Sequence, residues 1–315
     1  MTNSLEARFL EGNERALARG ISFLEGGDAA GQTLLRAARA RGGSAHIVGV
    51  TGSPGSGKST LTDALIVTAR AQGKRVAVLA VDPTSPYSGG AILGDRIRMM
   101  RHHQDEGVFI RSMATRGQLG GLAAATLQVA ALLDAFGFDL IFIETVGVGQ
   151  SEVDIVRVAD TTLLTLTPGQ GDGVQAFKAG IMEIADVFVI NKADQPGAGR
   201  LGREIKAALE LAPQQEGWRP PILETVALAG KGIAELFETL AAHRDHLETT
   251  GELTALRQQR VRSEVAALLS DRVRRRLVGL EPRLIDAVLA GDASADDLVD
   301  ALLGERPTAE PSVAG

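Results

Sequence analysis

The sequence contains no cysteine in its 315 residues. This absence excludes disulfides, thiolate metal sites, iron–sulfur clusters and cysteine nucleophiles. It fits a reducing compartment, so we expect the protein to be cytoplasmic. Aromatic residues make up only 3% of the chain, too few to build a platform on which nucleic-acid bases stack. The net charge of −6 also argues against a nucleic-acid partner, which usually requires a basic surface.

Long hydrophobic runs are missing as well. No apolar stretch approaches the length that is needed to cross a membrane. Residues 1–14 carry acidic side chains and lack the apolar core of a signal peptide, so we expect no membrane association. Glycine, in contrast, is abundant with 37 residues, which is typical of loops where the backbone closely approaches a ligand.

Seven short apolar runs follow one another along the chain, and helical stretches separate most of them. Their apolar content is nearly continuous rather than alternating, which is typical of strands buried on both faces of a parallel sheet. This strand–helix order favours an α/β fold. We predict a doubly wound, mostly parallel sheet of about seven strands. The runs cover 46–50, 75–81, 108–112, 139–144, 161–167, 186–191 and 221–227.

Helices are expected on both sides of this region. Residues 1–44 have apolar positions at helical spacing and should form an N-terminal helical segment before an α/β domain over 45–250. A long helix is expected over Thr254–Leu280, followed by two shorter ones, so that 251–303 forms a C-terminal helical arm. Residues 304–315 should form a disordered tail.

The long C-terminal helix carries a broad apolar face. Such a face is too large for a lone surface helix to expose, so the helix should take part in an interface. The face comprises Val261, Val265, Leu268, Leu269, Val273 and Leu277.

The strongest motif is GSPGSGKS, which directly follows the first apolar run and opens a helix. It matches the pattern G-x-x-x-x-G-K-[ST] of phosphate-binding loops in the required context. Its glycines let backbone N–H groups point at phosphate oxygens, and the helix N-terminus favours the same anion. Lys58 should reach the β and γ phosphates, and Ser59 should ligate Mg²⁺. The expected phosphate-binding residues are Gly52, Ser53, Pro54, Gly55, Ser56, Gly57, Lys58, Ser59 and Thr60.

A second motif, NKAD, ends the sixth apolar run about 130 residues after the first motif. The carboxylate of Asp194 can accept hydrogen bonds from the ring N–H and the exocyclic amine of guanine, whereas adenine would leave it unpaired. The stem of Lys192 can lie along the base. Together with Asn191, these residues predict a guanine site, and the two motifs together indicate GTP as the nucleotide.

Three carboxylates are candidates for the metal and water environment. Asp82 ends the second run, Asp95 opens the next helix, and Glu144 ends the fourth run before a glycine-rich loop. In doubly wound sheets, ligands bind at the carboxyl ends of the strands, where these three carboxylates are expected. Asp82 could instead be a turn residue, and Asp95 a helix N-terminal acid. We expect catalysis to depend on Lys58, Asp82, Asp95 and Glu144, and Mg²⁺ to be surrounded by Ser59 and the same three carboxylates.

Longer segments give the chain a specific resemblance. It is similar to the MeaB/ArgK family of GTPases, bacterial relatives of the human MMAA protein within the SIMIBI class of P-loop proteins. Beyond the two motifs, the resemblance rests on GNERALARGISFLEGGD (12–28), VDPTSPYSGGAILGDRIRM (81–99), IRSMATRGQLGGLA (110–123), ETVGVGQSEVD (144–154) and TPGQGDGVQAFKAGIMEIAD (167–186).

The resemblance implies a homodimeric GTPase that gates adenosylcobalamin loading and protection of a cobalamin-dependent acyl-CoA mutase. Methylmalonyl-CoA mutase is the typical client, and isobutyryl-CoA mutase is another conceivable one. The resemblance also implies switch segments around 82–98, 144–154 and 167–178, and a dimerisation arm that starts at Thr254. The backbone of Val226, Ala227 and Leu228 would close over the base.

Three other functions are compatible with the motifs. A metallochaperone GTPase that inserts nickel would need cysteine or clustered histidine, and this chain has neither. A GTP-dependent kinase of a small molecule or a transport protein would need a substrate base near the γ phosphate. A recruitment protein would bind GTP without turnover.

Overall fold

The computed structural model describes residues 4–82, 100–102, 104–114, 124–145, 154–169, 181–211 and 217–304. The chain divides into two compact units, which comprise residues 1–260 and 261–315. Each unit is described by itself. Among the described residues, no helix combines the length and the apolar character that a membrane span requires.

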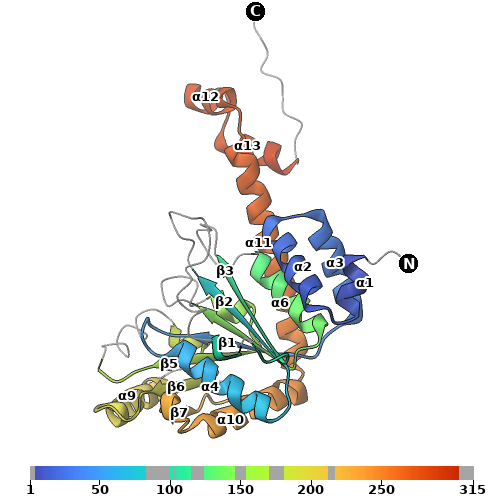
Figure 1. Ribbon diagram of the computed structural model, residues 1–315. Coiled ribbons are helices and arrows are strands. Elements are labelled where there is room, and N and C mark those ends of the chain that lie inside the picture. Colours follow the sequence, from blue (N-terminus) through green and yellow to red (C-terminus); the bar gives the residue numbers. More distant parts are fainter. Residues whose placement is uncertain are drawn as a thin grey trace, which may run out of the picture. The chain divides into compact units, whose positions relative to one another are not determined.

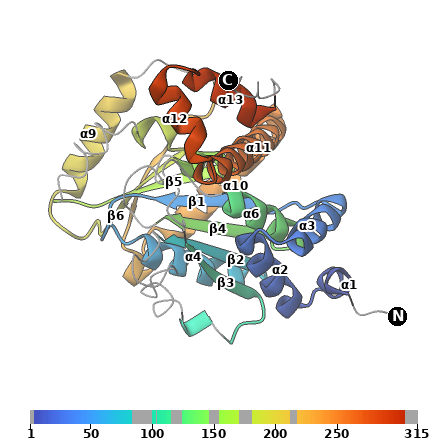
Figure 2. The ribbon, with the colours of Figure 1, turned by 90° about the horizontal axis from the view of Figure 1, so that it is seen from above.

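The first unit is built on a seven-stranded sheet in which every neighbouring pair of strands is parallel. The strand order is β3-β2-β4-β1-β5-β6-β7 (Figures 1 and 2, with β4 labelled in Figure 2). All seven predicted strands are present, and the predicted α/β class is confirmed. The strands are β1 (His46–Thr51), β2 (Val76–Asp82), β3 (Val108–Ala114), β4 (Leu140–Thr145), β5 (Thr161–Leu166), β6 (Val187–Asn191) and β7 (Ile222–Thr225).

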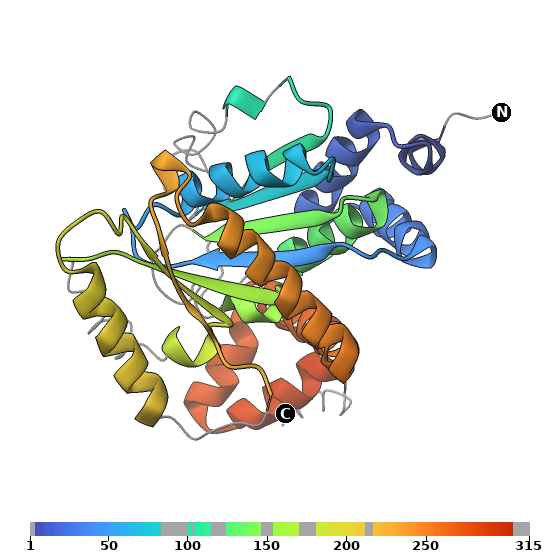
Figure 3. The same ribbon diagram turned by 90° about the horizontal axis from the view of Figure 1, so that it is seen from below.

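Helices cover both faces of this sheet, which is why its central strands are apolar on both sides (Figure 2). Alternate residues of β4 enter different cores. Ile141 and Ile143 join one cluster with helices α2 (Glu14–Gly26), α3 (Ala29–Arg41) and α6 (Ala124–Phe136). Leu140 and Phe142 join another with α4 (Lys58–Ala71) and α10 (Ile233–Thr250), seen beside the strands in Figure 3. Helix α9 (Ala198–Leu211) forms a third cluster with β5 and β6.

The expected N-terminal helical segment consists of α1 (Leu5–Leu10), α2 and α3. The apolar residues Leu17, Ile21 and Leu24 of α2 are buried in the same cluster as α6 and the sheet. A Cβ atom at Gly20 would lie 2.4 Å from Leu34 Cδ2, so glycine permits α2 to approach α3 this closely. Helices α1, α2 and α3 therefore complete the core of the first unit.

The C-terminal region forms three helices, as the sequence predicts. They are α11 (Glu252–Val278), α12 (Pro282–Ala290) and α13 (Ala295–Leu303). Residues 252–260 of α11 belong to the first unit, and the rest of the helix belongs to the second. Most of the expected tail, 305–315, lies outside the described residues.

A chain of buried polar side chains joins the beginnings of β1 and β5 to α10. The Thr161 hydroxyl lies 2.7 Å from His46 Nε2 and 2.7 Å from His243 Nδ1. All three residues are buried. Burial is the main cause that lowers the pKa of both histidines to about 4. Both imidazoles are therefore neutral at physiological pH.

This burial predicts a dependence of stability on pH. The unfolded chain binds protons at these histidines below about pH 6.5, whereas the folded chain does so only near pH 4. The contribution of these two histidines to the free energy of unfolding should therefore fall as the pH falls from 6.5 towards 4. In His243→Gln, the stability lost between pH 7 and pH 5 should shrink by about 2 kcal/mol, measured by urea unfolding. Glu238→Gln, which changes an exposed residue of α10, serves as the control. An unchanged pH dependence in His243→Gln would contradict the prediction.

Candidate nucleotide site

The loop that connects β1 to α4 is fixed by close contacts with two other strands. Gly52 has φ +135°, and a Cβ atom there would lie 2.1 Å from the carbonyl oxygen of Thr165 in β5. Gly57 has φ +90°, and a Cβ atom there would lie 2.3 Å from Asn191 Nδ2 at the end of β6. Only glycine satisfies both conditions at these positions. The glycines of the motif thus let the loop lie against the ends of β5 and β6.

Lys58 lies across this loop. Its ammonium group donates to the carbonyl oxygens of Gly52, at 2.6 Å, and Ser53, at 3.1 Å. Lys58 also begins α4, and the N-terminus of a helix favours a bound anion. The expected phosphate residues therefore form one loop and one helix N-terminus that are suited to a phosphate group, and Thr60 lies in the first turn of that helix.

A hydroxyl and a carboxylate meet beside this loop. Ser59 Oγ donates to Glu144 Oε1 at 2.5 Å, and both residues are buried. The parallel register explains the contact, because Val50 of β1 pairs with Glu144 of β4. Oxygen ligands of this kind suit Mg²⁺. The two expected metal ligands Ser59 and Glu144 are thus brought together.

The other two candidate carboxylates are less fully described. Asp82 is the last residue of β2, at the edge of the sheet where Val81 pairs with Thr145 of β4. Asp95 lies outside the described residues, as do most of the three expected switch segments. Of 144–154, the structure describes Glu144, Thr145 and Asp154, and burial raises the pKa of the Asp154 carboxyl.

The side chain of Asn191 connects the two sequence motifs. Its amide group donates to the carbonyl oxygen of Ser56 at 3.0 Å. Its side-chain oxygen accepts from Thr225 Oγ1 and from the backbone N–H of Ala227, both at 3.2 Å. Asn191 therefore fixes the phosphate loop and the segment after β7 to the same strand end.

Lys192 strengthens this connection. Among the described residues it is the one non-glycine residue with positive φ, at 56°, and its ammonium donates to the carbonyl oxygen of Gly55 at 2.9 Å. Asp194 is exposed beyond it, and Leu228 is 92% exposed on the neighbouring segment. Backbone and side-chain contacts thus place NKAD, the phosphate loop and residues 226–228 together at the carboxyl ends of the strands.

Sequence reasoning missed Thr225 and Thr165, which position this site. Thr225 supports Asn191, and Thr165 contacts Gly52 through its backbone. Both are polar residues near the carboxyl ends of apolar strands, and this pattern is the signal that could have identified them.

Comparison with known proteins gives consistent matches. A family model described as methylmalonyl Co-A mutase-associated GTPase MeaB matches residues 17–281. A putative GTPase of Pyrococcus abyssi is 53% identical over 273 residues, which are 86% of this chain and 84% of that protein. The methylmalonic aciduria type A homolog, mitochondrial, of Mus musculus is 37% identical over 268 residues, 81% of this chain and 65% of that protein. Among solved structures, an LAO/AO transport system kinase matches with a TM-score of 0.71 and 26% identity over 96% of both chains.

The exposed carboxylate of Asp194 is the group that we expect to recognise the guanine base, and its substitution tests this role. In Asp194→Asn, the amide presents a donor to guanine where the carboxylate presented an acceptor. GTP binding should weaken by about 2–4 kcal/mol, and xanthosine triphosphate should become the preferred nucleotide. Calorimetric titration with both nucleotides measures the change. Unchanged GTP affinity would show that Asp194 does not read the base.

Proposed function

The chain belongs to the MeaB family of GTPases, and from this premise we propose that it gates adenosylcobalamin loading and protection of an acyl-CoA mutase. The observation that carries the proposal is the family match over residues 17–281, since that family is described as associated with methylmalonyl-CoA mutase. The similarity to the mouse methylmalonic aciduria type A homolog supports the same client. Methylmalonyl-CoA mutase is thus the first mutase to test, and isobutyryl-CoA mutase is the second.

In this proposal, the nucleotide lies along the edge formed by the phosphate loop and NKAD. Lys58 and the N-terminus of α4 stabilise negative charge on the phosphates. Ser59 and Glu144, which already share a hydrogen bond, hold Mg²⁺ together with Asp82 and Asp95. The bound ion would neutralise charge that develops on the transferred phosphoryl group. One of the carboxylates orients the attacking water.

Base recognition is assigned to Asn191, Lys192 and Asp194, with the segment Val226–Leu228 as its cover. The support for this assignment is the pair of hydrogen bonds from Asn191 to both Ser56 and Ala227. Because one side chain contacts both the phosphate loop and the covering segment, the guanine and the phosphates would be bound at a fixed spacing.

We expect the isolated protein to hydrolyse GTP slowly and the mutase to accelerate the reaction. The motifs fix no arginine at the γ phosphate, and a cation supplied when a partner binds is worth about 10³–10⁵ in rate in other GTPases. Steady-state phosphate release should therefore rise when purified methylmalonyl-CoA mutase is added. Lys58→Ala, which lacks the phosphate-binding ammonium, should show no such rise.

A high intrinsic rate that neither mutase changes would contradict the gating function. It would leave the family assignment and the GTPase activity intact, because those do not depend on the client. The two conclusions can therefore fail separately.

We also propose a homodimer formed through the second unit. Its support is the set of apolar side chains on α11 that are about half exposed in the single chain, Val261, Val265, Leu269 and Leu277. Val265→Glu should convert the dimer to a monomer in light scattering. Val67→Glu changes an equally exposed valine on α4 and should leave the dimer intact. A Val265→Glu protein that remains dimeric would contradict this interface.

One observation favours a second candidate function. The solved structure with a TM-score of 0.71 is titled a transport system kinase. A kinase would transfer the γ phosphoryl group to a substrate, whereas a GTPase releases it as phosphate. Following γ-labelled GTP in the presence of the mutase, and separately with candidate small-molecule substrates, distinguishes the two functions.

A further inference from the structure

The first unit contains a cavity of about 280 Å³ at the edge of the sheet opposite to the nucleotide site. It lies where β1 and β4 begin and where α10 crosses them. Its apolar wall consists of Leu140, Phe237 and Leu240, all buried in the core around α10. This wall is suited to a short hydrocarbon chain.

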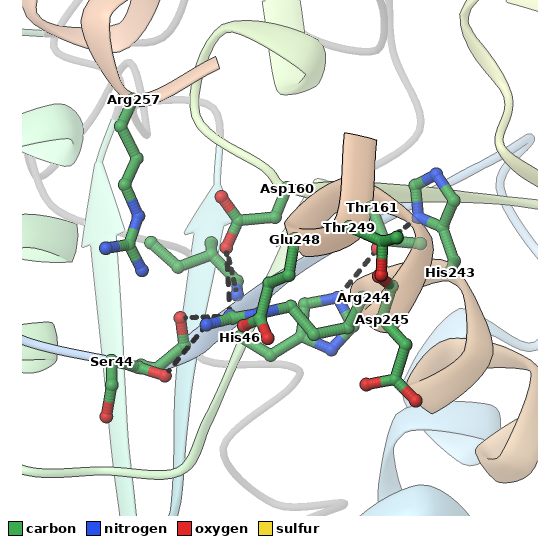
Figure 4. Close-up of polar contacts among 12 residues, drawn as sticks. Ser44, His46, Asp160, Thr161, His243, Arg244, Asp245, Glu248, Thr249 and Arg257 are labelled. Carbon is green, nitrogen blue, oxygen red and sulfur yellow. Dashed lines mark hydrogen bonds and ion pairs between the residues drawn. The ribbon is translucent and has the colours of Figure 1, made fainter. Parts of the chain in front are cut away.

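His46 provides a polar atom at this cavity. The residue is only 6% exposed, and it lines the cavity. Its Nε2 is bound to Thr161, whereas its Nδ1 has no hydrogen bond within the described part of the chain (Figure 4). A ring nitrogen without a protein partner leaves a hydrogen-bonding position that a ligand in the cavity can fill.

The neighbouring groups determine whether this nitrogen donates or accepts. Asp186 Oδ1 lies 3.7 Å from His243 Nε2, so above the Asp186 pKa of about 7 the ionised carboxylate favours the tautomer that carries a proton on Nε2. His243 Nδ1 then accepts the hydroxyl proton of Thr161, and Thr161 must accept from His46 Nε2. The remaining lone pair of His46 lies on Nδ1, which is therefore an acceptor.

Charged side chains of both signs also line the cavity, and some of them already have partners. Arg244 is engaged, because it is paired with Glu248 and donates to the carbonyl oxygens of Ala45 and Ser44. Figure 4 shows these contacts beside Asp245. The exposed carboxylates of Asp139 and Asp245 also line the cavity, as does Lys74. Asp139 Oδ2 accepts from the backbone N–H of Arg75 at 2.7 Å. With Glu248, three carboxylates and the two cations Lys74 and Arg244 line the cavity, so negative charge exceeds positive charge there by one.

We propose that this cavity binds an alkylammonium or alkylguanidinium group. The hydrocarbon part would lie on Leu140, Phe237 and Leu240, and the cationic head would donate to His46 Nδ1 and Asp245. Such a group can belong to a small molecule or to a lysine or arginine side chain of another protein. In both cases the chemistry of recognition is the same.

The first experiment is calorimetric titration of the full-length protein with n-butylguanidinium and n-butylammonium. It is performed at pH 8, because burial raises the pKa of Asp186 to about 7 and the carboxylate must be ionised. Both cations should bind, and n-butanol, which lacks the charge, should not. Equal binding of n-butanol, or no binding of either cation, would overturn the proposal.

Two single substitutions should change the affinity in opposite directions. Asp245→Asn removes a carboxylate and should weaken n-butylguanidinium binding about tenfold, as expected for the loss of one charge-assisted contact. Lys74→Gln removes the competing cation and should strengthen binding. Glu238→Gln, an exposed acid on the same helix that does not line the cavity, should leave it unchanged. Weaker binding in Lys74→Gln, or equal losses in Asp245→Asn and Glu238→Gln, would overturn the proposal.

The role of His46 has its own readout. Nitrogen NMR of the imidazole at pH 8 should show Nδ1 without a proton, and its resonance should shift when n-butylguanidinium is added. A proton on Nδ1 in the free protein would overturn the proposed acceptor.

A final comparison identifies the source of the group. A capped Gly-Gly-Arg-Gly-Gly peptide presents the same cation on a polypeptide. Binding of both n-butylguanidinium and the peptide supports a protein side chain, whereas binding of n-butylguanidinium alone supports a small molecule.

Discussion

The side-chain amide of Asn191 is the contact on which the nucleotide edge depends. It donates to Ser56 in the phosphate loop and accepts from Thr225 and Ala227 on the other side. A buried amide that satisfies groups on three segments fixes their relative positions, since removing it would leave several polar groups without partners. The close approach of Gly57 to Asn191 belongs to the same arrangement, because a side chain at Gly57 would separate the loop from the strand.

The parallel sheet brings the other polar side chains of the candidate site to the same side, at the carboxyl ends of the strands. All strands point the same way, so the carboxyl ends of β1, β4, β5 and β6 carry Thr51, Glu144, Thr165 and Asn191 to one side. The register of β1 with β4 is what places Glu144 within hydrogen-bond distance of Ser59. The chemistry of the site is therefore a consequence of strand order as much as of the two motifs.

The sequence was informative where structure is local and less so where it depends on distant contacts. Every strand was predicted, because residues such as those of β1 and β4 are apolar on both faces. The long helix was expected from Thr254 to Leu280 and extends from Glu252 to Val278. The packing of the N-terminal helices against α6, the support of Asn191 by Thr225, and the connection of His46 to His243 through Thr161 were not predicted. Each joins segments far apart in the chain, so each requires the order β4-β1-β5-β6-β7, which apolar runs do not encode.

At the amino ends of the strands, on the side of the sheet away from the candidate nucleotide site, backbone N–H groups need acceptors. Strand beginnings expose N–H groups, and aspartates accept from them: Asp160 from Ile47 and Asp134 from Ala45. Asp160 is buried and is balanced by Arg260 at 2.7 Å, at the beginning of α11. Asp160 thus accepts from the backbone at the beginning of β1 and also pairs with Arg244 of α10 and Arg260 of α11. Because β1 leads into the candidate phosphate loop at one end and begins with His46 at the other, this strand connects the candidate nucleotide site with the proposed cation cavity.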